Sequence, residues 1–290
     1  MAVKTLKSFL FVVVALCGLS LVGNVDTARA GLIPYSFIQP HDFQLPIGKE
    51  VPAGGLDLYV SYNTYREEGK AWDGDSGTRS VFLNLNRYIH VWTVEGLDNW
   101  SFLTEGVVGL GRVLTKDDNS ETGLLDTMVG GAAAYRTGNW TSVLEYFLFM
   151  PTGSDELSSN SWNHSLTYLT NYHVGAFTFD GSVGYQLKGD SKVGGTHIEQ
   201  GDTFYVNTVF AYKFQDLIEP YIKVDYQTTE SGKNKNTGDS ISSQDELAVG
   251  IGNHFTLSDR LTLALSYEKG VSGRNTTKTN AGWARFIWVF

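Results

Sequence analysis

The 290-residue sequence has little charge, little proline and a single cysteine. Charged residues make up 18% of the chain, whereas an average soluble domain carries about 25%. One cysteine cannot form a disulfide framework or a thiolate zinc site, so both are excluded. Acidic residues outnumber basic ones and give a net charge of −9, which argues against binding to nucleic acid through a basic face. The mean hydropathy of −0.15 is too polar for a bundle of membrane helices.

Glycine and aromatic residues, by contrast, are abundant: there are 32 glycines, and aromatics make up 13% of the chain. Few charges combined with many aromatics exclude a disordered acidic chain. Two classes of protein remain. One is a soluble all-β protein, and the other is a β-barrel that is apolar outside and polar inside.

The N-terminal segment has the pattern of an export signal. Two lysines precede an apolar stretch at 9–22, and residues 28–30 read Ala-Arg-Ala, a small-x-small cleavage site. The alternative is a transmembrane anchor, but a spanning helix needs about 20 apolar residues. We therefore expect a signal peptide over 1–30, which contains Cys17. Its removal takes away three basic residues and one acidic residue and changes the net charge from −9 to −11.

Apolar and other residues alternate with a period of two along the rest of the chain. Between Leu261 and Tyr267, for example, every second residue is a leucine or a tyrosine. This is the period of β-strands, and a tilted strand needs roughly 9–11 residues to cross a bilayer. The pattern predicts twelve such strands, at 55–65, 78–92, 99–113, 124–136, 140–151, 161–172, 176–188, 202–214, 218–229, 244–256, 260–269 and 280–290.

The predicted connections alternate between long and short. The long, polar ones follow the odd-numbered strands, at 66–77, 114–123, 152–160, 189–201, 230–243 and 270–279. The short ones lie at 93–98, 137–139, 173–175, 215–217 and 257–259. Outer-membrane barrels have long external loops and short periplasmic turns, whereas a soluble sandwich has no reason to sort its loops by length. We therefore predict an all-β fold, a transmembrane antiparallel β-barrel of about 12 strands of the bacterial outer-membrane type.

Charged residues occupy one face of the clearest predicted strands. We expect the other, apolar face to contact lipid, because a Lys or Arg in mid-bilayer costs about 2–4 kcal/mol. Arg87 and Arg112 fall on this apparent lipid face, where a bulge or a strand end would shift the register. The residues predicted to face the lumen are Asp57, Glu105, Arg136, Glu145, Lys213, Lys223, Asp225, Glu246, His254 and Arg285. They either line a pore that selects by charge and width or pair with one another in a plugged lumen.

Aromatic residues cluster at the turn side of the predicted strands, which is typical of an interfacial girdle; they are Trp92, Trp100, Trp140, Tyr172, Phe214, Phe255 and Trp288. The last segment ends at Phe290 and places Phe286, Trp288 and Phe290 on one face. This resembles the C-terminal recognition strand that the barrel assembly machinery of Gram-negative bacteria reads. We therefore expect the mature protein in the bacterial outer membrane, in contact with its lipids and with lipopolysaccharide.

The segment between the signal and the first strand is apolar and broken by proline. We divide the chain into a signal peptide at 1–30, an N-terminal segment at 31–52 and a barrel at 53–290. The segment 31–52 is either a plug folded into the barrel or a disordered periplasmic tail.

An enzyme is the weaker alternative. Outer-membrane phospholipases have twelve strands and use Ser, His and Asn, but the nearest feature here, residues 163–166, has the wrong spacing and lacks an Asn-Gly. A nucleophilic serine also needs a positioned base and oxyanion donors, which the sequence does not reveal. The histidines form no i,i+4 metal pair. We therefore predict no catalytic residues, no metal and no cofactor.

The sequence also resembles a known family, the transporter-like outer-membrane proteins of the meta-pathway of phenol degradation. The residues that carry the resemblance are Phe-Met-Pro-Thr-Gly at 149–153, Asn-Ser-Trp at 160–162, Gly-Asp at 201–202 and the aromatic C-terminal strand. The family often has a tyrosine soon after Pro-Thr-Gly and a longer Asn-rich stretch before the tryptophan, whereas 154–160 is short here. The resemblance implies a barrel associated with the degradation of aromatic compounds.

These observations predict a barrel for the passive passage of small hydrophobic or aromatic molecules. Passage would be passive because the chain has no nucleotide-binding loop. The competing class is a non-conducting barrel that is structural or acts through its loops.

Overall fold

A computed structural model of the chain describes residues 46–68, 71–72, 79–115, 120–154, 157–193 and 195–290. The predicted signal peptide and most of the segment 31–52 lie outside these residues. Within the described residues, no helix is long and apolar enough to cross a membrane. Apart from the short 3-10 helix η1 (Gly48–Glu50), the regular structure in these ranges consists of strands.

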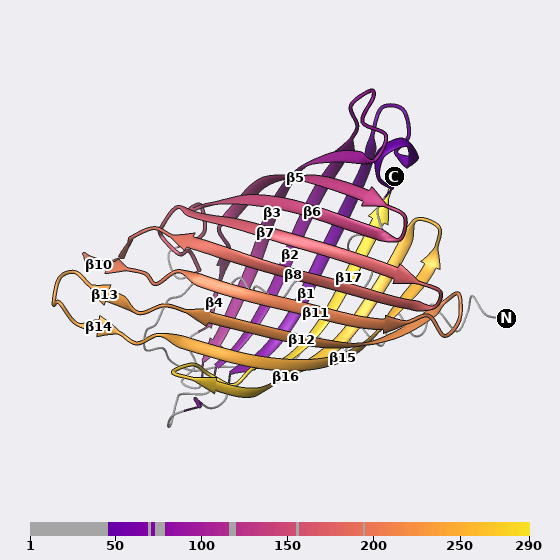
Figure 1. The fold of residues 1–290 in the computed structure, drawn as a ribbon. Coiled ribbons are helices and arrows are strands. Elements are labelled where there is room, and N and C mark those ends of the chain that lie inside the picture. The colour runs from indigo at the N-terminus through magenta and orange to yellow at the C-terminus, as the bar shows by residue number, and fades with distance from the viewer. Residues whose placement is uncertain (1–45, 69–70, 73–78, 116–119, 155–156, 194) are drawn as a thin grey trace.

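Twelve antiparallel wall strands form a closed barrel (Figure 1). They are β1 (Leu56–Glu68), β2 (Arg79–Trp92), β3 (Trp100–Thr115), β5 (Thr127–Thr137), β6 (Trp140–Met150), β7 (Asn163–Val174), β8 (Phe177–Lys188), β11 (Thr203–Tyr212), β12 (Ile218–Thr229), β15 (Gln244–Ser258), β16 (Leu261–Arg274) and β17 (Asn280–Val289). The short β4 (Ser120–Leu124) pairs with β3 just ahead of β5 and continues the fourth wall strand.

Closure is made by the first and last strands. β1 pairs with β2 on one side and with β17 on the other, from Leu58 opposite Val289 to Arg66 opposite Ala281. The ladder therefore returns on itself, and the wall has no open edge to pair with another chain.

The twelve predicted strands are confirmed. The largest difference is in β16, which was expected to end at 269 and ends at Arg274. One feature was not predicted: the fourth wall strand is interrupted at Leu125 and Asp126, both of which are buried. Side chains of adjacent strand residues normally point to opposite faces, so two consecutive buried residues mark an irregularity that alternation alone does not reveal.

The two ends of the barrel differ. At the turn end, wall strands are joined by short turns, three of which contain glycines with positive φ, Gly96 (φ 84°), Gly138 (φ 54°) and Gly175 (φ 59°). At the loop end, two connections form a small sheet beyond the wall (Figure 1). This extension sheet contains β9 (Ser191–Val193), β10 (Thr196–Glu199), β13 (Gly232–Asn234) and β14 (Ser240–Ile241).

Aromatic side chains surround the outside of the turn end. Six of the seven predicted girdle residues are exposed, and Phe255 is half-buried. Rings of neighbouring strands pack against each other, with centroid distances of 5.0 Å for the stacked Trp92 and Phe102 and 5.6 Å for the tilted Trp140 and Tyr172. Such amphipathic rings belong at the level of the lipid head groups.

The faces of β1 and β2 are the reverse of the prediction. Their apolar side chains, expected to meet lipid, are buried inside the barrel, whereas polar side chains lie outside. Alternation distinguishes two faces of a strand, but it does not show which faces outward when the interior is itself apolar. Arg87 is therefore inside without any register shift, while Arg112 is exposed on the outer face as expected.

Candidate functional site

The interior of the barrel has two unlike walls. The apolar wall consists of the inward side chains of β1 to β3, which include Leu58, Val60, Val81, Leu83, Leu85, Ile89, Val91, Leu103 and Val107. The polar wall consists of the inward side chains of β7, β8 and β11, which include Ser165, Thr167, Asn171, Asp180, Ser182, Gln186 and Asn207. The order of strands around the ring places these two walls on different sides of the lumen.

A buried arginine cluster interrupts the apolar wall. Arg87 of β2 donates to Glu105 of β3 through Nε (2.7 Å) and to Glu145 of β6 through Nη2 (2.6 Å). The guanidinium also lies 5.4 Å from the ring centroid of Phe147 and donates to the hydroxyl of Tyr62 at 3.5 Å. One cation thus bridges two carboxylates from different strands, which ties β2, β3 and β6 together across the inside.

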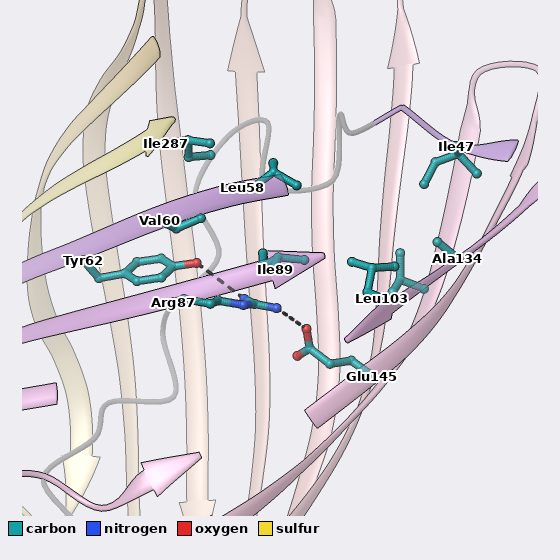
Figure 2. A pocket seen from close by; sticks show the side chains of 11 residues that line it. Ile47, Leu58, Val60, Tyr62, Arg87, Ile89, Leu103, Ala134, Glu145 and Ile287 are labelled. Carbon is teal, nitrogen blue, oxygen red and sulfur yellow. Dashed lines mark hydrogen bonds and ion pairs between the residues drawn. The ribbon is translucent and has the colours of Figure 1, made fainter. Parts of the chain in front are cut away.

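An apolar pocket lies between the arginine cluster and the turn end (Figure 2). Its lining comes from the apolar wall and its neighbours, with Tyr62, Arg87 and Glu145 at one side; the remaining residues are Ile47, Leu58, Val60, Ile89, Leu103, Ala134, Val143 and Ile287. Ile47 belongs to the segment before the first strand, and it is buried here. The end of the N-terminal segment therefore packs inside the barrel.

Hydrogen bonds fix this part of the N-terminal segment to the turn end. The amide of Gly48 donates to Ser101 Oγ (2.8 Å), and the amide of Lys49 donates to the carbonyl of Asp98 (3.0 Å). Glu50 pairs with Arg136 at 2.7 Å. Gly48 has φ +62°, and a Cβ there would lie 1.8 Å from the carbonyl oxygen of Asp98, so only glycine fits.

A second cluster lies across the ring from the first. Lys223 of β12 is fully buried and bridges Glu268 of β16 (2.8 Å) and Asp225 (3.2 Å). Its ammonium lies 5.6 Å from the ring centroid of Trp283 on β17. A second pocket adjoins this cluster and is lined by Arg66, Asn207, Asp225, Tyr226, Gln227, Glu246, Ala248, Glu268, Thr279, Ala281 and Trp283.

The other predicted lumen residues have separate positions. Glu246 is buried and accepts hydrogen bonds from the backbone amide and the hydroxyl of Thr279, each at 2.7 Å. Arg285 is buried on β17 between Trp283 and Ile287, and His254 is buried on β15. Seven of the predicted residues are thus inside, namely Glu105, Glu145, Lys223, Asp225, Glu246, His254 and Arg285.

Three predicted positions differ from this pattern. Asp57 is on the outer face, where it accepts hydrogen bonds from Tyr88 (2.5 Å) and pairs with His90 (2.8 Å), so placing it in the lumen was wrong. Lys213 is also not in the lumen, because it is exposed in a turn and pairs with Asp216. Arg136 is half-buried at the turn end and bonded to Glu50.

At the loop end, a buried aspartate organises the connection between β6 and β7. Asp126, in the interruption of the fourth wall strand, accepts hydrogen bonds from the amides of Gly153 and Ser159 and from the hydroxyls of Ser158 and Ser159, at 2.6–3.1 Å. Leu157 is buried beside Gly111 of the apolar wall. We call this arrangement the Asp126 clasp; it holds 157–159 at the mouth of the lumen.

The residues considered for hydrolysis do not meet. His164 is exposed on the outer face of β7 and bonds to Tyr146 (2.7 Å), whereas Ser165 is buried on the inner face beside Tyr205 (2.9 Å). A base on one face of a strand cannot activate a hydroxyl on the other. Among the described residues, no group of three or more His, Cys, Asp or Glu side chains is placed to hold a metal ion.

Sequence reasoning missed Tyr62, Arg87, Phe147 and Trp283 as interior residues around the two clusters. Arg87 carried a signal, since it was one of the two charges, with Arg112, that fell on the assumed lipid face. Asp225 shares β12 with Lys223, but Glu105, Glu145 and Glu268 lie on other strands than the cations they pair with, and these contacts follow only once the ring and its registers are known.

A family model described as "Putative MetA-pathway of phenol degradation" matches residues 56–286, from the start of β1 into β17. The chain belongs to this family. The resemblance seen in the sequence is therefore confirmed, and the family's Pro-Thr-Gly at 151–153 lies in the connection that the Asp126 clasp holds. No curated protein matches the chain.

Solved structures support the same fold for this family member. An outer membrane channel from Pseudomonas putida F1 is similar with a TM-score of 0.77 and 16% identity, over 87% of this chain and 100% of that one. The transport unit of the autotransporter AIDA-I from Escherichia coli is similar with a TM-score of 0.52 and 11% identity, over 88% and 94% of the two chains. The fold is that of an outer-membrane barrel.

Proposed function

We propose that the barrel is a passive outer-membrane channel for small hydrophobic or aromatic molecules. The observation that carries this proposal is the apolar wall, because the interior of a general porin is polar. Leu83, Leu85 and their neighbours form a buried apolar strip that runs along three strands inside the barrel, and the pocket beside Leu58, Ile89 and Leu103 is its hollow part. An aromatic ring gains transfer free energy along such a strip, at about 25 cal/mol per Å² of apolar surface removed from water.

The polar wall complements this strip. A molecule with an apolar body and a hydroxyl or carboxylate can place its body on the apolar wall and its polar group toward hydroxyls and amides such as Thr167 and Asn207. The cations Arg87 and Lys223 are already bonded to carboxylates, so we expect these two to hold the wall rather than to bind a passing ion strongly.

The comparisons favour a channel of this kind. The family description refers to phenol degradation, and the similar structure from Pseudomonas putida is an outer membrane channel.

We also propose that residues 1–30 are a cleaved signal peptide and that the turn end is periplasmic. The segment 31–52 would act as a plug, since its described end packs in the apolar pocket near the turn end. Phe286, Trp288 and Phe290 would serve as the assembly signal.

Uptake by vesicles tests the proposed function. The refolded barrel is reconstituted into liposomes, and entry of phenol, benzoate and glucose is measured relative to protein-free vesicles. We expect faster entry of phenol and benzoate than of glucose, together with single-channel conductance in planar bilayers. A folded barrel that shows no conductance and no uptake would contradict the proposal.

Substitution of the apolar wall makes the test specific. Leu85→Asn, fully inside, is expected to lower phenol entry about tenfold and to spare glucose, because one buried apolar side chain is worth about 1.5–3 kcal/mol. Thr104→Asn, exposed on the outer face of β3, is the matched control and should change neither rate. An equal loss of phenol entry in both variants would show that phenol does not cross the barrel along the apolar wall.

The second candidate is a non-conducting barrel that acts through its loops. The extension sheet favours it, because two loops beyond the wall are ordered into one small sheet. The vesicle experiment separates the two candidates. A barrel that acts only through its loops is expected to show no conductance, and Leu85→Asn is expected to leave phenol entry at the level of protein-free vesicles.

A further inference from the structure

The outer face of β1 and β2 carries four polar side chains at mid-height of the barrel. Ser61 and Asn63 of β1 lie opposite Asn86 and Asn84 of β2, and all four alternate with the buried residues of the apolar wall. We call these four residues the amide ladder. In an outer-membrane barrel this is the level of the lipid hydrocarbon, where polar groups are expected to be rare.

The amide ladder is a directed chain of hydrogen bonds. Tyr59 donates to Asn86 Oδ1, Asn86 donates to Asn84 Oδ1 (2.7 Å), and Asn84 donates to Asn63 Oδ1 (2.7 Å). Asn63 in turn donates to Ser61 Oγ (3.2 Å) and to the carbonyl of Ala284 on β17 (3.5 Å). The chain crosses the seam at which the barrel closes.

This arrangement leaves acceptor capacity on the amide oxygens of the ladder. A side-chain amide oxygen can accept two hydrogen bonds, and each of the three Oδ1 atoms accepts one within the described residues. The amides already have partners within the ladder, but lipid tails offer no donor to the acceptor capacity that remains, and polar groups in hydrocarbon are costly. The ladder is therefore costly against lipid and favourable against another polar surface.

The surface beside the ladder is low on the side of β17. The low part is on the β17 side, where Ala284 lies opposite Asn63 and Gly282 opposite Tyr65; on the β3 side the exposed Val108 and Leu110 lie opposite Asn86 and Asn84. A Cβ added to Gly282 would meet nothing within 4 Å. Small residues allow the backbones of neighbouring membrane segments to approach closely enough for side-chain amides to meet.

We propose that the amide ladder is the contact between two copies of this chain lying side by side in the membrane. A soluble partner cannot reach this depth, and lipid cannot bond to the amides. Two copies inserted in the same direction are related by a two-fold axis along the membrane normal, which preserves depth, so each ladder meets the other at its own level. Each amide contains both donors and acceptors, as a self-complementary contact requires.

Disulfide crosslinking tests this contact without touching the ladder. The only cysteine of the chain is Cys17, in the predicted signal peptide, so a single reporter can be introduced as Gly282→Cys. Thr208→Cys, on the outer face of β11, is the control. In membranes treated with copper phenanthroline, we expect a disulfide-linked homodimer for G282C that is absent for T208C. Equal yields in both, or linkage of G282C to a different protein, would overturn the proposal.

Removal of the amides completes the test. We expect the variant Asn63→Leu, Asn84→Leu, Asn86→Leu in the G282C background to remain a heat-modifiable, folded barrel on unheated gels and to lose the crosslinked dimer. A folded variant that still crosslinks as well as G282C would overturn the role of the ladder. Should this variant not fold, Asn86→Leu alone is used, and it is expected to lower the dimer yield. Phenol entry is measured in parallel, because loss of the dimer with transport intact separates this proposal from the proposed function.

Discussion

Single buried cations hold the inner surface of the barrel together. Arg87 and Lys223 each bridge two carboxylates, and their partners come from different wall strands. Such pairs contribute little net free energy compared with apolar packing, but removing one member leaves uncompensated charge in a medium of low dielectric constant. We infer that their main effect is on specificity, because they link particular wall strands through side chains inside the barrel.

Lys223→Met is therefore expected to destabilise the barrel by about 3–5 kcal/mol, because Asp225 and Glu268 are left buried and facing each other. The free energy of unfolding in detergent micelles, from urea titration, checks this value. Arg274→Met is the control, since its partner Asp245 forms an exposed ion pair worth about 0–1 kcal/mol. Similar losses of unfolding free energy in both variants would contradict a stabilising role for the buried Lys223 cluster.

The position of Arg87 shows what the sequence could and could not reveal. The charges on β6, β12 and β17 were assigned inward correctly, because apolar and charged residues alternate there as expected for a polar interior. Arg87 and Asp57 were assigned to the wrong faces, because β1 and β2 bury their apolar side chains inside. The identity of the outer face depends on what fills the lumen, which is a property of the whole ring.

Among the elements, the loop-end connections depend on specific polar contacts. The Asp126 clasp is the densest of these, with one carboxylate accepting four hydrogen bonds from 153–159. Alternation predicted the wall strands within a few residues, but it did not reveal this clasp, because the interruption at Asp126 and the residues it binds are 27–33 positions apart.

Asp126→Ala is expected to release the connection between β6 and β7. Hydrogen bonds to a charged group contribute about 1.5–3 kcal/mol each, so the loss of the carboxylate leaves several buried donors without an acceptor. We expect faster cleavage at 151–162 in limited proteolysis, with the wall strands protected. Asp216→Ala, which removes a fully exposed carboxylate in a turn, should not alter the cleavage. Unchanged proteolysis of the first variant would contradict a holding role for Asp126.

The extension sheet should loosen in acid. Asp190 accepts hydrogen bonds from Lys235 (2.6 Å) and pairs with His197 (2.9 Å), and these contacts hold the pKa of its carboxyl below the usual value. A lowered pKa means that the ionised form stabilises the folded sheet; this contribution is full above the ordinary pKa of Asp and is lost as pH falls through the lowered one. Hydrogen exchange at 196–199, corrected for intrinsic rates, should rise between about pH 7 and pH 2.

Lys235→Ala provides the comparison for this pH dependence. The pKa of Lys235 is raised mainly by its hydrogen bond to Asp190, so removal of the ammonium should bring the faster exchange at 196–199 already at neutral pH. An acid response that is unchanged in the variant would show that the Asp190 contacts do not hold the sheet.

In the molecule as a whole, closure joins segments more than 200 residues apart. β17 completes the ring against β1, and the amide of Phe290 donates to the carbonyl of Asp57 (3.0 Å) just beyond the last pair. The ring of Phe290 is half exposed at the turn end, next to Trp288 (5.4 Å between centroids). The backbone of Phe290 thus helps to close the barrel through its hydrogen bond to Asp57. Its side chain faces outward and is accessible from outside the barrel.

Phe290→Ala is expected to separate these two roles. The backbone hydrogen bond survives the substitution, and the lost ring contacts are worth about 0.5–1.5 kcal/mol, so refolding of the purified chain into detergent should proceed to nearly the same extent. Assembly in cells, measured as the heat-modifiable barrel in outer-membrane fractions, should fall strongly, because we propose Phe290 as part of the assembly signal. Phe214→Ala, an exposed aromatic at the same end but in a turn, is expected to assemble normally. Equal assembly of both variants would contradict a signal at Phe290, and poor refolding in detergent would assign its ring to closure instead.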